Sequence, residues 1–152
     1  MAEYIQSNTT EVVNLDNPIT FDSSITCTRG YVIHENGTGG FILRGIVNNP
    51  TCGFARYRVT FNGNIAIPTG GDVTPIAIGI SVNGEVRQSS KAIFTPAAAG
   101  DYGNVTSTAI ITVPRGCCFN LAIDYISAAA VGVTPTPSIE VQNGNVTITR
   151  IA

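Results

Sequence analysis

Residues 117–125 read Cys117-Cys-Phe-Asn-Leu-Ala-Ile-Asp-Tyr125 and alternate between large apolar side chains and smaller or polar ones. Successive side chains of an extended strand point to opposite faces, so this spacing predicts a strand with one buried face. The same alternation runs through Tyr57–Phe61, Ile76–Val82 and Val146–Thr149. No long window repeats with the period of a helix, and the chain is therefore predicted to be all-β.

Turn residues separate these runs. The pairs Asn62-Gly63, Asn83-Gly84 and Asn143-Gly144 are each flanked by strand-like sequence. We expect all three to be type I′ hairpin turns, because Asn and Gly tolerate the positive φ that such turns require. Longer loops are expected at 70–72, 97–99, 114–116 and 134–137. Short strands divided in this way fit a β-sandwich, a jelly roll or a barrel.

Composition narrows the class of protein. The 152 residues fit one domain, and 43% hydrophobic content argues against a disordered chain. Net charge is −2, with scattered arginines and the single lysine Lys91, so we expect no nucleic-acid partner. No apolar run is long enough to span a bilayer, and no membrane association is expected. The N-terminus has no basic leader before an apolar block, which indicates synthesis in a cytoplasm rather than secretion by a signal peptide.

The four cysteines do not have the spacing of a zinc site. Cys117 and Cys118 should point to opposite faces of a strand, so they should not bridge each other or share a metal. A disulfide between Cys27 and Cys52 stays open. The favoured interpretation is free thiols packed as small hydrophobes, as expected for a cytoplasmic origin.

Candidate catalytic and metal-binding residues are few. His34 is followed by Glu35 and stands at a predicted strand end, which is more typical of a surface residue than of a general base. Gly37-Thr-Gly-Gly40 lacks the Lys-Ser/Thr ending of a phosphate loop and is interpreted as a hairpin tip. Asp72 and Asp101 each offer one loop carboxylate, too few oxygens for calcium by themselves. We therefore expect no catalytic residue, no metal and no cofactor.

Four blocks of sequence, in this order, resemble the C1q/TNF-like jelly rolls of bacterial and phage surface proteins. The blocks are Ala55–Phe61, Ile78–Ser90, Thr108–Ile123 and Asn145–Ala152. The sequence is most similar to the C-terminal domain of BclA-type exosporium proteins and to related phage virion proteins. Two features depart from that pattern: Arg56 replaces a small residue before the tyrosine, and no collagen-like stalk precedes the domain.

The resemblance implies an antiparallel jelly-roll β-sandwich at residues 18–152, preceded by a short extended arm at 1–17. It also implies a homotrimer with a structural role and no catalytic residues. Within that trimer, the interface residues expected from the sequence are Tyr57, Phe61, Phe119 and Tyr125.

The favoured function is a trimeric capsid decoration or head-fibre protein on a phage particle, made in the bacterial host cytoplasm. Its N-terminal arm would dock on the major capsid protein or another virion component. The docking residues expected from the sequence are Tyr4, Ile5, Val12 and Val13.

The alternative function is a receptor- or carbohydrate-binding head, on a phage tail fibre or on a spore surface. A host-surface glycan would then be the partner. Exposed tyrosines could stack on sugar rings, although a core or interface position is the favoured interpretation of each. The tyrosines concerned are Tyr4, Tyr31, Tyr102 and Tyr125. A hydrolase on the same scaffold is the third and weakest hypothesis.

Overall fold

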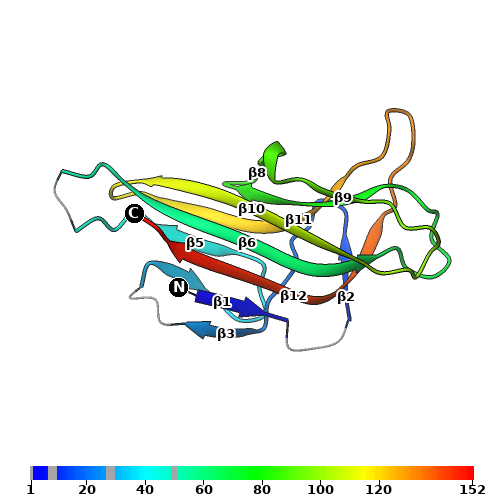
Figure 1. Ribbon diagram of the computed structural model, residues 1–152, viewed down its shortest axis with the longest axis horizontal. Helices are drawn as coiled ribbons and strands as arrows, with labels where there is room; N and C mark the ends of the chain where they lie inside the picture. Colours follow the sequence, from blue (N-terminus) through cyan, green and yellow to red (C-terminus); the bar gives the residue numbers. More distant parts are fainter. Residues whose placement is uncertain (1, 7–9, 27–29, 49–50) are drawn as a thin grey trace.

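Two six-stranded antiparallel sheets make up the protein (Figure 1). The computed structural model describes residues 2–6, 10–26, 30–48 and 51–152. In the first sheet the order is β10-β6-β12-β1-β3, and β2 also pairs with β12. Its strands are β1 (Ala2–Ile5), β2 (Thr10–Asn14), β3 (Ser23–Thr26), β6 (Phe54–Ala66), β10 (Gly103–Pro114) and β12 (Ser138–Arg150).

The second sheet has the order β4-β5-β11-β7-β8, and β9 also pairs with β7. Its strands are β4 (Val32–His34), β5 (Phe41–Arg44), β7 (Ile76–Val82), β8 (Glu85–Val86), β9 (Ala92–Phe94) and β11 (Cys118–Ser127). A single 3-10 turn, η1 (Gln88–Ser90), separates β8 from β9. In the part of the chain that the structure covers, no helix has the length and hydropathy needed to cross a membrane.

Alternating side chains fill the space between the two sheets. In β10, the odd-numbered positions from Val105 to Val113 are buried and the even-numbered ones are exposed. The same alternation holds along β6 from Ala55 to Ile65. Burial of these apolar side chains is the main favourable term in folding such a sandwich. The predictions of an all-β fold and a jelly-roll sandwich are confirmed.

One of the three predicted hairpin turns is confirmed. Asn83 and Gly84 join β7 to β8 with φ of 54° and 82°. Asn62-Gly63 lies inside β6, and Asn143-Gly144 lies inside β12, so these two predictions are wrong. At Asn143, φ is 57° and the pairing with β6 shifts register between Gln142 and Asn145. The positive φ at Asn143 therefore belongs to a bulge in a long strand rather than to a turn.

Within the predicted arm at 1–17, the described strands β1 and β2 pair with the first sheet. β1 lies between two partners: Ala2 is opposite Ile148 of β12 on one side and opposite Thr26 of β3 on the other. Next along the chain, β2 pairs with β12. Glu11 in β2 accepts a hydrogen bond of 2.8 Å from the hydroxyl of Thr20. These strands complete the first sheet, so the segment is not a free arm.

Candidate interaction face

The outer face of the first sheet consists largely of uncharged polar side chains. Threonine favours strands because its branched side chain fits the pleated surface, and its hydroxyl can face water. Pairing brings these residues into rows that run across the strands. Thr60 of β6 is opposite Thr108 of β10 on one side and Thr147 of β12 on the other. In the next row, Asn62 is opposite Thr106 and Asn145.

Hydrogen bonds between neighbouring strands order this face. The hydroxyls of Thr60 and Thr108 are 3.3 Å apart. The Asn62 Oδ1 atom accepts from Thr106 Oγ1 at 3.1 Å and from Asn104 Nδ2 at 2.9 Å. Cross-strand pairs of this kind hold side chains in place without charge. The result is a pre-ordered surface of hydroxyl and amide groups.

Exposed apolar side chains occur at two opposite edges of the same face. Ile110, in the edge strand β10, is 52% exposed. Across the sheet, Ile25 of β3 is 64% exposed and Val12 of β2 is 61% exposed. Each pairs with a residue that points away from the core, and therefore points outward as well. Ile25 is level with Thr147 of β12 and Val12 with Glu140, so these two lie apart along their edge. The face thus carries unlike exposed apolar side chains at its two edges, with a polar surface between them.

Three of the four residues predicted at a subunit interface lie in the core instead. Tyr57, Phe61 and Tyr125 are fully buried within one chain, so their side chains have no surface to offer a second copy. Phe119 is partly buried and packs against the same core. The apolar alternation correctly predicted burial, but the covering partner is the opposite sheet.

The four residues predicted to dock on a capsid differ in how exposed they are. Tyr4 and Val13 are buried in the core, and Ile5 is half-buried. The Tyr4 ring meets Phe41 edge-on at 4.7 Å between centroids, and burial raises the pKa of Tyr4 to about 12. Only Val12 is broadly exposed. A docking role through Tyr4 or Val13 would require the strands to leave the sheet.

The single histidine is held by the backbone. Nδ1 of His34 is 2.8 Å from the carbonyl oxygen of Gly40, and Nε2 is 3.0 Å from that of Phe21. The ring stacks on Phe41 at 4.3 Å between centroids. Both nitrogens are therefore engaged with carbonyl groups, and neither is presented to a substrate as a base. His34 connects the β4–β5 hairpin to Phe21.

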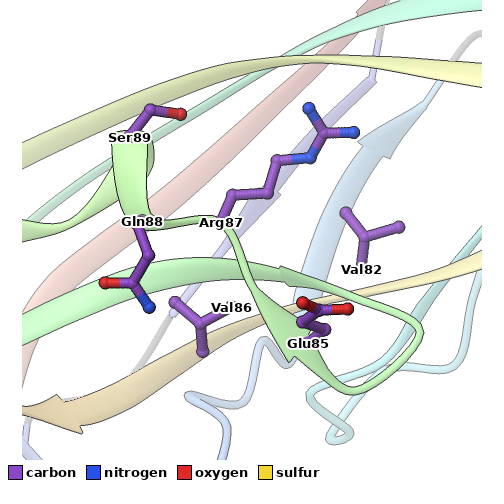
Figure 2. A pocket seen from close by; sticks show the side chains of 6 residues that line it. All are labelled: Val82, Glu85, Val86, Arg87, Gln88 and Ser89. Carbon is purple, nitrogen blue, oxygen red and sulfur yellow. The ribbon is translucent and has the colours of Figure 1, made fainter.

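An open depression of about 510 Å³ lies beside β8 (Figure 2). Its lining residues are Val82, Glu85, Val86, Arg87, Gln88 and Ser89. The Arg87 side chain extends away from Val86, and its Nη1 atom is 3.4 Å from the carbonyl oxygen of Ile110 in β10. The lining has no base beside its one serine hydroxyl, and Arg87 links the β8 excursion to the edge of the first sheet.

Among the described residues, no group of three or more His, Cys, Asp or Glu side chains is placed to share a metal ion. The pKa of the Asp124 carboxyl is clearly shifted. Burial raises it, with a smaller contribution from the charge of Asp16, while a hydrogen bond from Ser81 opposes the rise. The Asp16 backbone N–H donates to the carbonyl of Tyr125 at 2.8 Å, which places Asp16 beside the strand that contains Asp124.

The prediction that the thiols pack as small hydrophobes is wrong for three cysteines. Cys52, Cys117 and Cys118 are free and exposed. Cys27 lies outside the described residues, and Cys52, its possible disulfide partner, is a free thiol.

No protein-family model and no curated protein sequence matches the chain. Solved structures do match it. The globular domain of zebrafish complement 1qA aligns with a TM-score of 0.56 at 15% identity, over 95% of this chain and 93% of that one. Eiger TNF from S. frugiperda aligns with a TM-score of 0.59 at 10% identity, over 100% of this chain and 92% of that one. Murine APRIL aligns with a TM-score of 0.52 at 12% identity, over 95% of both chains. The chain therefore has the C1q/TNF-like jelly-roll fold, as the sequence resemblance predicted.

Proposed function

We propose that the protein is a non-enzymatic structural component of a phage particle, a homotrimeric capsid decoration or head-fibre protein. The observation that supports the trimer is the pair of unlike exposed apolar side chains on one sheet face, Ile110 at one edge and Ile25 at the other. Isolated exposed apolar residues are ordinary, but here they flank an otherwise polar and ordered surface.

A cyclic trimer uses unlike edges of this kind in a defined way. Rotation about a threefold axis places two different surfaces of neighbouring copies against each other, unlike a twofold dimer, in which the same patch meets itself. Ile110 of one copy would pack against Ile25 of the next, because the two lie at similar heights along β12: Ile110 is in the row of Thr149 and Ile25 in the row of Thr147. The threonine and asparagine rows between the two edges would then face the axis, where interfaces commonly hold ordered water.

Substitution of Ile110 tests the oligomeric state. We expect the wild-type protein to be a trimer at micromolar concentration and Ile110→Asp to be a folded monomer, because a carboxylate would be desolvated in the contact. Size-exclusion chromatography with light scattering measures the mass, and circular dichroism checks the fold. Val131→Asp, in the fully exposed loop before β12, is the matched control and should stay trimeric.

A wild-type monomer, or an Ile110→Asp trimer, would reject this contact. The particle assignment has a separate test. Mass spectrometry of purified, nuclease-treated particles should detect the protein together with the capsid protein. Its absence from intact particles that carry all other structural proteins would reject the virion role and leave the trimer result untouched.

A further inference from the structure

Arginines that are far apart in the sequence meet at one end of the sandwich. Arg44 ends β5 opposite Cys118, and Arg56 near the start of β6 is opposite Thr112. Arg150 ends β12. In Figure 1 these strand ends lie together on the left, beside the turn that joins β10 to β11. We name this region the basic end; its arginines are Arg44, Arg56, Arg58, Arg115 and Arg150.

No Asp or Glu side chain comes from the segments that surround these arginines. The described segments that form the basic end are 30–33, 43–48, 51–58, 110–118 and 148–152, and none contains Asp or Glu. All 10 acidic residues lie in other parts of the chain. The net charge of −2 therefore conceals a separation of charge, and the basic end has a positive potential that attracts anions.

A cavity of about 410 Å³ opens at this end. Its lining residues are Tyr31, Val47, Asn48, Cys52, Phe54, Arg56, Arg150 and Ala152. The guanidinium of Arg56 lies 4.5 Å from the centre of the Phe54 ring, and that of Arg150 lies 4.4 Å from the centre of the Tyr31 ring. Stacking on a ring fixes the plane of a guanidinium and leaves its edge N–H groups for a ligand.

Arg150 has unused donor capacity. Its Nε atom donates to the main-chain oxygen of Ala152, the last residue of the sequence, at 3.1 Å. Its Nη1 atom is buried and has no hydrogen-bond partner among the residues that the structure describes. A buried donor without an acceptor is unfavourable, and buried polar groups in folded proteins almost always have a partner. An acceptor brought by a ligand would satisfy this group.

We propose that this cavity binds an acidic sugar through its carboxylate. A planar carboxylate matches the edge of a guanidinium, which donates two parallel hydrogen bonds to it. The cavity is within the range of about 300–1,000 Å³ of small-molecule sites, more than a bare anion fills. Val47 and the Phe54 ring give it an apolar wall for one face of a sugar ring, and the Asn48 amide can pair with a hydroxyl. The site belongs to a single chain and is independent of the trimer.

Three small molecules test separately whether the carboxylate and the sugar ring are each needed for binding. Glucuronate and glucose differ only in the carboxylate, and acetate is the carboxylate without the ring. We expect glucuronate to produce saturable shifts of the Tyr31 and Arg150 amide signals in heteronuclear NMR titrations of the full chain. Acetate should bind at least about tenfold more weakly, and glucose should not saturate at the same concentrations.

Two arginines on the same strand give a matched pair of variants. Arg56→Gln should weaken glucuronate binding about tenfold, the usual effect of losing one charge-assisted hydrogen bond. Arg58→Gln removes the same charge but does not line the cavity, and should change affinity by no more than about twofold. Thermal melting confirms that both variants are folded.

Equal binding of glucose, equal binding of acetate, or no saturable binding of glucuronate would each overturn the proposal. So would equal losses in Arg56→Gln and Arg58→Gln, because that result would assign the effect to the general field of the basic end. None of these results bears on the mass of the oligomer or on its presence in particles.

Discussion

The hydroxyl of Tyr57 explains how a polar aromatic residue sits in the centre of the core. Its single proton faces two carbonyl oxygens: it donates to that of Arg44, and that of Tyr31 is 3.2 Å away. Burial raises the pKa of Tyr57, while the neighbouring Arg150 opposes the rise. A buried tyrosine needs such partners, since an unsatisfied hydroxyl in an apolar interior costs about 1–3 kcal/mol. One core side chain thereby ties the first sheet to the second beside the basic end.

Asp124 makes the stability of the fold dependent on pH. Because burial raises its pKa above the usual 3.8, the folded chain holds this proton more tightly than the unfolded chain does. The free energy of unfolding therefore falls as pH rises through the raised pKa, and the ionised carboxylate is unfavourable at neutral pH. Below the unfolded pKa both states are protonated and this dependence vanishes.

Asp124→Asn should accordingly raise the melting temperature at pH 7 and leave it unchanged near pH 3. The amide is neutral at both pH values and can keep the hydrogen bond with Ser81. Differential scanning calorimetry at both pH values measures the two differences. Asp101→Asn, at an exposed position, is the control and should have no effect at either pH. Equal stabilisation at pH 3 and pH 7 would show that ionisation of Asp124 is not the cause.

At the scale of elements, the long strands could be predicted because their sequences alternate over many residues. Ile76–Val82 is β7 as predicted, and Val146–Thr149 lies within β12. The Asn-Gly pair in β6 was misleading because its preference for a turn is outweighed by the pairing of this strand with β10 and β12 on its two sides. Gly63 is favoured there for another reason: a β-carbon at this position would lie 2.7 Å from the Phe61 ring.

The site was harder to predict than the fold. Alternation indicates that Phe61 and Tyr125 are buried, but a buried face looks the same whether a second sheet or a second subunit covers it. The polar segment around β1 resembled a free arm because few of its residues reach the core: Ala2 and Tyr4 in β1, and Val13 in β2. The basic end arises because β6 pairs with β10 and β12 while β5, in the second sheet, ends beside them, and a scan along the chain cannot detect this arrangement.

Neighbouring residues of β2 test whether this segment is part of the sandwich. Val13 is buried opposite Ile139, whereas Val12 is exposed. Val13→Asp should lower the free energy of unfolding by about 3 kcal/mol or more, because it places a carboxylate in the core. Val12→Asn, which adds no charge opposite Glu140, should change the subunit's own stability by less than about 0.5 kcal/mol. Urea unfolding at low protein concentration measures both. Small, equal effects would mean that the segment leaves the sheet in solution.

At the scale of the whole molecule, the proposed trimer would orient the separation of charge in the same way in all three copies. A threefold axis keeps corresponding ends of all copies at one height along the axis. The three basic ends would then share one pole, each with its own cavity. Weak binding of a single sugar at each cavity could add up to firm attachment to a polymer that repeats the same sugar, provided that its repeats span the cavities.

The central place of β12 in the first sheet also determines the order in which the protein can fold. This strand is the last one described in the chain, yet it pairs with β6, β1 and β2, and Ile148 is opposite Ala2. The first sheet therefore cannot close during synthesis until β12 has been made. Pairing over such sequence separations folds slowly, in milliseconds to seconds. Until then the edges of β6 and β1 are open to other chains, and crowded synthesis favours aggregation over assembly.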